Sequence, residues 1–332
     1  MTSRHLVDPA LIGILERPPL EIRAEALPEI RATVRDLYLT LFGEGDPSVT
    51  VTEHLVPGPT GAPDVRLFVY TPPGPRAARP ALFHIHGGGF ILGDASMTAP
   101  LCQARALEFD CVVVSVDYRL APEAPYPGPV EDCYAGLTWT AAHATELGID
   151  PARIVVGGES AGGGLAAAVA LLARDRAGPA IAMQFLIYPM LDHRTATPAE
   201  PSPNPHAGEF AWTREANRFG WTAMLGDLDP AGEIPSYCSP ARARTLTGLP
   251  AAFIAVGALD LFVDEDIEYA ARLCRDGVPV ELHVYPGAFH GFDAMATAPV
   301  SVQFQEDCAS AMKRAFGRSP HDDSIAAKLA MP

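Results

Sequence analysis

The chain has 332 residues, of which 48% are hydrophobic and 19% are charged, and its formal net charge at pH 7 is −16. This composition excludes global disorder and allows one sizeable core with an accessory lobe. Because an acidic chain without a basic run repels a polyanion, nucleic acid is excluded as a partner.

The cysteines and the longest apolar run narrow the class of protein further. Six cysteines are scattered without a Cys-x-x-Cys pair, which predicts reduced core residues and neither a zinc site nor a disulfide scaffold. Residues 1–9 meet charge and proline before any apolar stretch, so they do not resemble a secretion signal. The longest apolar run, 165–173, is far shorter than a bilayer span. We therefore expect a cytoplasmic protein without a membrane span.

The first part of the chain, residues 1–45, is predicted to form helices outside the main sheet, because the apolar residues of 30–42 recur at helical spacing. Residues 49–56 and 65–70 alternate in polarity, which predicts an antiparallel pair of strands.

After Pro80 short buried strands alternate with helical stretches. The strands are predicted at 81–86, 111–117, 153–157, 181–188, 251–256 and 280–285. The helices are predicted at 97–109, 129–147, 161–174, 264–276 and 299–316. This alternation predicts an α/β fold with a mainly parallel sheet and helices on both faces. The tail, 319–332, carries no motif and is expected to be loosely held.

One interval, residues 193–238, interrupts the alternation. It contains four prolines between 198 and 205 and then the aromatic residues Trp212, Phe219 and Trp221. An insertion this long in an α/β domain is usually a lid or a binding element. We expect it to form a cap with residues 1–45, so that the core consists of residues 46–192 and 239–318.

The segment Gly158-Glu159-Ser160-Ala161-Gly162 stands between a predicted strand and an alanine-rich helix. This Gly-x-Ser-x-Gly pattern is typical of a nucleophile elbow, in which a side chain two residues before or after the serine would clash. The hydroxyl then lies at a helix N-terminus, where unpaired N–H groups favour a developing negative charge.

A serine hydroxyl needs a base to take its proton and a third group to orient that base. Asp260 and His290 each follow a predicted strand, at the sheet edge where open α/β proteins place their sites. The order Ser160, Asp260, His290 is that of the α/β-hydrolase triad. Asp264 is the competing acid, but it stands beside Glu265 where acids complement a helix dipole, so Asp260 is preferred.

A second motif, His84-Ile85-His86-Gly87-Gly88-Gly89-Phe90, follows another apolar strand. Consecutive glycines let the backbone approach a bound oxygen, so the N–H groups of Gly88 and Gly89, with that of Ala161, are predicted to form an oxyanion hole. His86 and Gly87 are expected to support this loop.

Two other interpretations of this motif, a metal site and a phosphate-binding loop, are less favoured. A metal pair at His84 and His86 lacks a downstream cluster of ligands, and a phosphate-binding loop would need Gly-x-Gly-x-x-Gly or a Lys-Ser/Thr ending. We therefore expect no metal and no cofactor.

Taken together, these motifs resemble the hormone-sensitive-lipase-like esterases, also called bacterial family IV, within the α/β-hydrolase fold. The resemblance covers about residues 80–316, and further matching segments are Asp117-Tyr118-Arg119-Leu120-Ala121-Pro122-Glu123, Asp264-Glu265 and Gly291-Phe292. Glu159 departs from the family, many of whose members carry aspartate there.

The resemblance implies hydrolysis of short- to medium-chain carboxylic esters through an acyl-enzyme, a helical cap and no cofactor. It also implies an eight-stranded sheet and a homodimer formed through the last strand, here 280–285. The substrate pocket is expected to include Phe90, Trp212, Phe219 and Trp221.

Two alternative functions stay open. An amidase or arylacetamide-type deacetylase would use the same triad with a nitrogen leaving group. A small-molecule receptor on this scaffold is disfavoured because candidates for all three triad positions are present.

Overall fold

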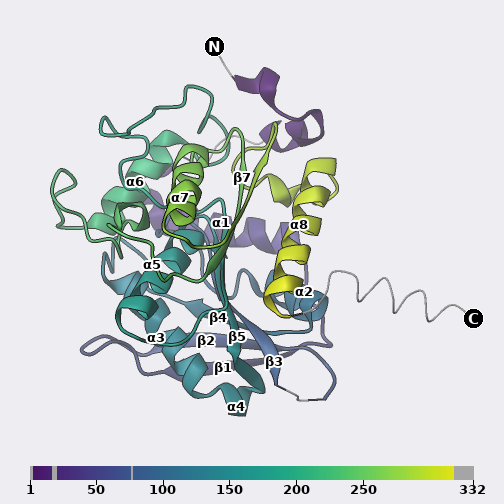
Figure 1. The fold of residues 1–332 in the computed structure, drawn as a ribbon. Coiled ribbons are helices and arrows are strands. Elements are labelled where there is room, and N and C mark those ends of the chain that lie inside the picture. The colour runs from purple at the N-terminus through teal and green to yellow at the C-terminus, as the bar shows by residue number, and fades with distance from the viewer. Residues whose placement is uncertain (1–2, 17–20, 76–77, 318–332) are drawn as a thin grey trace, which may run out of the picture.

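The computed structural model describes residues 3–16, 21–75 and 78–317, and its centre is one eight-stranded sheet (Figure 1). The strand order is β1-β2-β4-β3-β5-β6-β7-β8. The strands are β1 (Thr50–Val56), β2 (Val65–Thr71), β3 (Arg79–Ile85), β4 (Val112–Asp117), β5 (Ile149–Glu159), β6 (Met183–Ile187), β7 (Ala251–Gly257) and β8 (Val280–Tyr285). The predicted α/β-hydrolase fold is confirmed.

Among the described strands, only β2 runs against the others. β1 pairs antiparallel with β2, and β2 pairs antiparallel with β4, whereas every later pairing is parallel. All of β3 and β6 is buried, as expected for strands that are covered on both faces. The predicted antiparallel pair and the predicted parallel strands are therefore both found.

Helices cover both faces of the sheet, and alternate side chains of one strand serve opposite faces. In β4, Val112 and Val114 belong to one hydrophobic cluster, whereas Val113 belongs to the other. The first cluster includes residues of α3 (Gly128–Ala142), α5 (Ala161–Asp175) and α7 (Val263–Arg275). The second includes residues of α2 (Ala99–Phe109) and α8 (Pro299–Ala315). The sequence of elements thus produces a three-layer sandwich.

One predicted helix is divided. Residues 129–147 form α3 and the short α4 (Ala144–Leu147), separated at His143, whose φ of −104° and ψ of 16° leave the helical region. The imidazole Nδ1 of His143 lies 2.9 Å from the Trp139 carbonyl oxygen, and the two rings stack. The division thus coincides with this side-chain contact, and Gly148 then ends α4 in the left-handed conformation.

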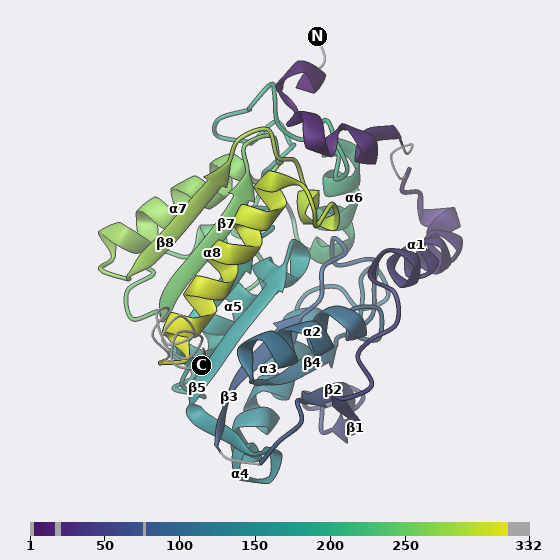
Figure 2. The same cartoon turned by 90° about the vertical axis from the view of Figure 1, so that its right-hand side faces the viewer.

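The N-terminal segments and the insertion meet at one end of the molecule (Figure 2). The N-terminal part forms η1 (Ser3–Leu6), η2 (Pro9–Glu16), η3 (Ala24–Ala26) and α1 (Leu27–Phe42). The insertion contains α6 (Arg214–Leu225), and short 3-10 turns η4 (Pro240–Arg242) and η5 (Phe292–Ala294) follow later. Leu27 and Ile30 of α1 share a cluster with Phe219 of α6, which joins the two segments.

Some further expectations concern single residues and the tail. Cys274 is exposed on α7, so the prediction that the cysteines are core residues is wrong for it, whereas the other five are buried. Among the described residues, no helix is long and apolar enough to cross a bilayer. The tail 319–332 lies outside the described residues.

The buried carboxyl group of Asp266 is expected to make the stability of the fold depend on pH. Its side chain faces the interior from α7, and both carboxyl oxygens lack a hydrogen-bond partner among the residues described. Burial, and then the nearby Glu265 and Asp260, raise the pKa of Asp266 well above its usual range.

The pH dependence follows from this direction. Below about pH 4 folded and unfolded chains both hold the proton, but at higher pH the unfolded chain ionises first and stability falls. Asp266→Asn should therefore be about 1–3 kcal/mol more stabilising at pH 8 than at pH 4 in urea unfolding. Asp264→Asn, an exposed carboxyl on the same helix, is the control. An equal effect of Asp266→Asn at both pH values would contradict this assignment.

Candidate active site

Ser160, His290 and Asp260 lie together, although they are far apart in the sequence. His290 Nε2 lies 3.0 Å from the Ser160 hydroxyl oxygen, and His290 Nδ1 lies 2.8 Å from Asp260 Oδ2. The neutral histidine that donates from Nδ1 to the carboxylate leaves Nε2 free to accept the serine proton. The three side chains thus form a continuous relay of hydrogen bonds.

The corner between β5 and α5 holds Ser160 in an unusual backbone conformation. Its φ is 58° and its ψ is −122°, a backbone conformation that residues other than glycine rarely adopt. A Cβ atom at Gly158 would lie 2.1 Å from the Ile85 carbonyl oxygen, and one at Gly162 would lie 2.0 Å from that same oxygen. Both glycines are therefore required, because the corner packs directly on the end of β3.

Asp260, and not Asp264, contacts the histidine. Asp260 is fully buried, and its second oxygen accepts a hydrogen bond from the Phe262 amide at 3.0 Å. Asp264 is exposed and lines a cavity of about 480 Å³ beside residues 192–202. The two carboxyls are four positions apart, yet only Asp260 reaches the imidazole.

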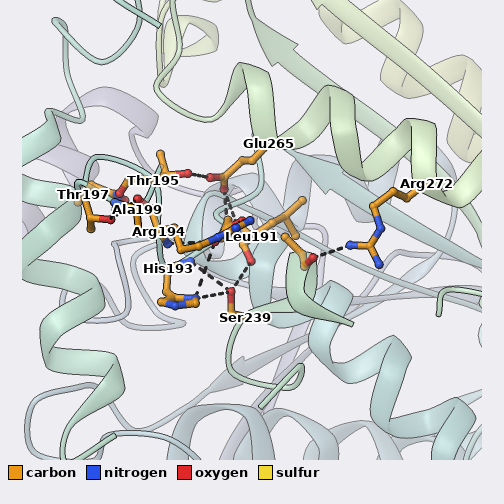
Figure 3. Close-up of polar contacts among 12 residues, drawn as sticks. Leu191, His193, Arg194, Thr195, Thr197, Ala199, Ser239, Glu265 and Arg272 are labelled. Atoms are coloured by element: carbon orange, nitrogen blue, oxygen red, sulfur yellow. Dashed lines mark hydrogen bonds and ion pairs between the residues drawn. The ribbon is translucent and has the colours of Figure 1, made fainter. Parts of the chain in front are cut away.

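Glu265 has a role that sequence reasoning missed. Its carboxyl group accepts hydrogen bonds from the Leu191 amide at 2.6 Å, from the Asp192 amide at 3.2 Å and from the Thr195 hydroxyl (Figure 3). Burial, and then Asp192, raise the pKa of Glu265 well above its ordinary value. Glu265 therefore connects α7, the helix after Asp260, to the start of the insertion.

Aromatic rings confine the imidazole of His290. The Tyr188 ring lies 4.7 Å and the Phe262 ring 5.3 Å from the His290 ring, centroid to centroid. The Tyr188 hydroxyl donates to Asp293 Oδ1 at 2.9 Å, and Asp293 lies in the turn just after His290. This hydrogen bond connects Tyr188, the residue just after β6, to the loop that carries His290. No sequence motif had indicated this contact.

The predicted oxyanion loop lies beside Ser160. A Cβ on Gly87 would be 3.4 Å from Ser160 Cβ, which places the loop directly against the nucleophile. Gly88 and Gly89 have positive φ, and among the described residues neither N–H group donates to a backbone carbonyl. Ala161 is the first residue of α5, where helix N–H groups lack intrahelical partners.

His86 is placed where it can brace this loop. Its Nδ1 lies 2.8 Å from the Gly87 carbonyl oxygen, and its ring stacks on Tyr118 at 4.3 Å. The Tyr118 hydroxyl donates to the His86 carbonyl oxygen at 3.0 Å. His84 contacts different groups, Ser115 and Glu159, so the two histidines of the motif do not share a partner.

The four residues expected to line the pocket separate into two positions. Trp212 covers the oxyanion loop, because a Cβ at Gly89 would lie 2.2 Å from its indole ring, and the Phe90 ring contacts Trp221 at 5.0 Å. Phe219 packs instead in the cluster with Leu27 of α1. The structure thus brings Trp212 to the triad and places Phe219 at the junction with the N-terminal helices.

Comparison with known proteins gives the family. A family model described as the alpha/beta hydrolase fold matches residues 82–294, which is well over half of the chain. The chain belongs to the α/β-hydrolase family. The resemblance to hormone-sensitive-lipase-like esterases is confirmed with it.

Individual relatives cover nearly the whole chain. Esterase LipI of Mycobacterium tuberculosis is 36% identical over 87% of this chain and 89% of its own length. Carboxylesterase NlhH of the same organism is 36% identical over 95% of this chain and 98% of its own. A solved structure named Bacterial Heroin Esterase is 40% identical, covers 95% of this chain and 99% of its own, and superposes with a TM-score of 0.88.

The α/β-hydrolase site is suited to acyl transfer. Ser160 is only 6% exposed, and the glycine loop lies beside it in a setting with little water. Fixed donors in such a setting stabilise a tetrahedral oxyanion more strongly than water does. The arrangement can therefore form and break an acyl-serine bond.

The choice of acid in this hydrolase can be tested directly. Asp260→Asn should lower kcat by about 10³ to 10⁴-fold, because an amide at this position favours the wrong imidazole tautomer. Asp264→Asn removes the exposed neighbouring carboxyl and should change kcat by about twofold or less. Steady-state hydrolysis of p-nitrophenyl acetate by both variants gives the comparison. A larger loss in Asp264→Asn than in Asp260→Asn would overturn the assignment.

Proposed function

We propose that the chain is a serine carboxylesterase that hydrolyses short- to medium-chain carboxylic esters. The observation that carries this proposal is the continuous contact from Ser160 through His290 to Asp260 beside the glycine loop. The relatives named esterase, carboxylesterase and heroin esterase support ester bonds as the substrate class.

In the proposed mechanism the Ser160 hydroxyl attacks the ester carbonyl while His290 accepts its proton. Asp260 holds the imidazole tautomer and stabilises the imidazolium. The N–H groups of Gly88, Gly89 and Ala161 receive the oxyanion, and His290 then protonates the leaving alcohol. Water, deprotonated by the same histidine, attacks the acyl-enzyme and releases the acid.

The size limit on the acyl group is proposed from the surroundings of the glycine loop. A cavity of only about 20 Å³ lies between this loop, Val34 and Tyr38 of α1, and Met97. On another side Trp212 rests on Gly89, and its indole N–H donates to Asn217 at 3.2 Å. We infer that residues 1–45 and 193–238 act together as a cap that restricts long acyl chains.

A panel of p-nitrophenyl esters from acetate to palmitate tests this function. We expect kcat/KM to be highest for the short esters and to fall by about tenfold or more toward the longest, since steric exclusion of a few methylenes costs 1–3 kcal/mol. Faster hydrolysis of anilides than of matched aryl esters would favour the amidase instead, and no turnover of any ester would reject the esterase.

The same panel tests the cap. Trp212→Ala should raise the ratio of octanoate to acetate hydrolysis, because it removes the ring above Gly89. Trp139→Ala, which removes an indole from α3 where it stacks on His143, should leave the ratio unchanged.

We also propose a homodimer through residues 280–285, and a cytoplasmic location stays a prediction of the sequence. Support for the dimer is that β8 is the last strand of the sheet and that Val284 is 39% exposed there. Light scattering should give twice the monomer mass, and Val284→Arg should shift it to the monomer. Leu55→Arg, on the opposite edge of the sheet, should stay dimeric. A monomeric wild-type chain would reject the dimer.

A further inference from the structure

Glu159, the residue just before Ser160, contacts two basic side chains, those of Arg105 and His84. Its Oε1 accepts a hydrogen bond from Arg105 Nη2 at 2.7 Å, and its Oε2 lies 3.0 Å from His84 Nε2. The three side chains are 14%, 13% and 0% exposed, respectively. None of them contacts the Ser160 hydroxyl, so the relay described above does not account for this cluster.

The partners of Glu159 come from the segments that bracket the oxyanion loop. His84 lies in β3, two residues before His86, and is paired in register with Gly157 of β5. Arg105 lies in α2, which follows the loop. One carboxylate therefore connects the end of the nucleophile strand to the segments before and after the oxyanion donors.

The contacts are ionic at neutral pH. Burial would raise the pKa of Glu159, but Arg105 and His84 together lower it far below its usual value. Burial likewise opposes a charged His84, but Cys102 and Glu159 outweigh it and raise the pKa of His84 to about 9. His84 Nδ1 also lies 3.2 Å from the Ser115 hydroxyl oxygen, so both ring nitrogens have partners.

We propose that Glu159 is a positioning residue, which sets the distance between the Ser160 hydroxyl and the oxyanion donors through its contacts with His84 and Arg105. The inference rests on the proposed esterase function. Ser160 has a strained backbone conformation, and such a conformation persists only where neighbouring contacts over-determine it. The Glu159 carboxylate contacts both His84 and Arg105. The attacked ester carbonyl must fit between the Ser160 hydroxyl and the oxyanion donors, which these contacts hold in place.

The prediction concerns kcat and not substrate binding. Glu159→Gln keeps the size of the side chain but removes the charge that holds the two cations. A shift of about 1 Å between nucleophile and oxyanion donors costs on the order of 10²-fold in rate, so we expect kcat to fall by about 10 to 100-fold. KM for p-nitrophenyl acetate should stay within about twofold, because the pocket is unchanged. Glu159→Asp, which keeps the charge but shortens the reach, should lie between.

The measurement counts functional sites before it compares rates. Active sites are titrated to completion with a p-nitrophenyl phosphonate, and kcat is expressed per titrated site beside the thermal unfolding midpoint. Asp132→Asn is the matched control, because Asp132 forms an ion pair with Arg119 at 2.7 Å and is 1% exposed but lies outside the site. It should lower the unfolding midpoint while kcat per titrated site stays that of the wild type.

The outcomes separate the two levels of the proposal. Wild-type kcat per site in Glu159→Gln, or an equal loss in Asp132→Asn, would overturn the positioning role and leave the esterase intact. No ester turnover by the wild type would reject the esterase itself. Should Glu159→Gln not fold, His84→Asn applies the same test because it removes one arm only, and wild-type kcat per site in that variant would again overturn the role.

Discussion

The close approach of the β5–α5 corner to the end of β3 is the constraint on which the site depends. Two glycines allow the backbone of the corner to rest on the Ile85 carbonyl oxygen. The chain then continues from Ile85 into the glycine loop, so this contact allows Ser160 and the loop to lie close together. A side chain at either glycine would push the β5–α5 corner away from the end of β3.

The parallel sheet brings Asp260 and His290 to the same edge as Ser160. Asp260 follows β7 and His290 follows β8, and strands that run in the same direction end at the same edge. The Nδ1 contact with Asp260 alone would leave the imidazole room to tilt. Tyr188 and Phe262 confine the ring by packing, which converts a contact between loops into a fixed geometry.

The fold and the meeting of Ser160, Asp260 and His290 could be predicted because their signals are local in the sequence. Apolar strand runs, Gly158-Glu159-Ser160-Ala161-Gly162 and the glycines after His86 each carry their reason within a few residues. The supporting contacts have no such signal. Glu265 resembles an ordinary acid at a helix start, yet its partners lie about 70 positions away in sequence. The division of the helix at His143 likewise coincides with a side-chain contact that residue periodicity does not encode.

The same buried polar contacts explain how a nearly closed site keeps its shape. Ser160 is 6% exposed and Trp212 is 9% exposed, so the reacting groups have little water around them. Removal from water strengthens every charge interaction, which favours the oxyanion but penalises any polar group without a partner. Trp212 meets this condition by donating to Asn217, which in turn donates to the Thr195 carbonyl oxygen. Thr195 also donates to Glu265, so the indole ring beside the glycine loop is linked to the helix that follows Asp260. A chain of hydrogen bonds therefore connects Trp212 of the insertion to Glu265 on α7, the helix that begins three residues after Asp260.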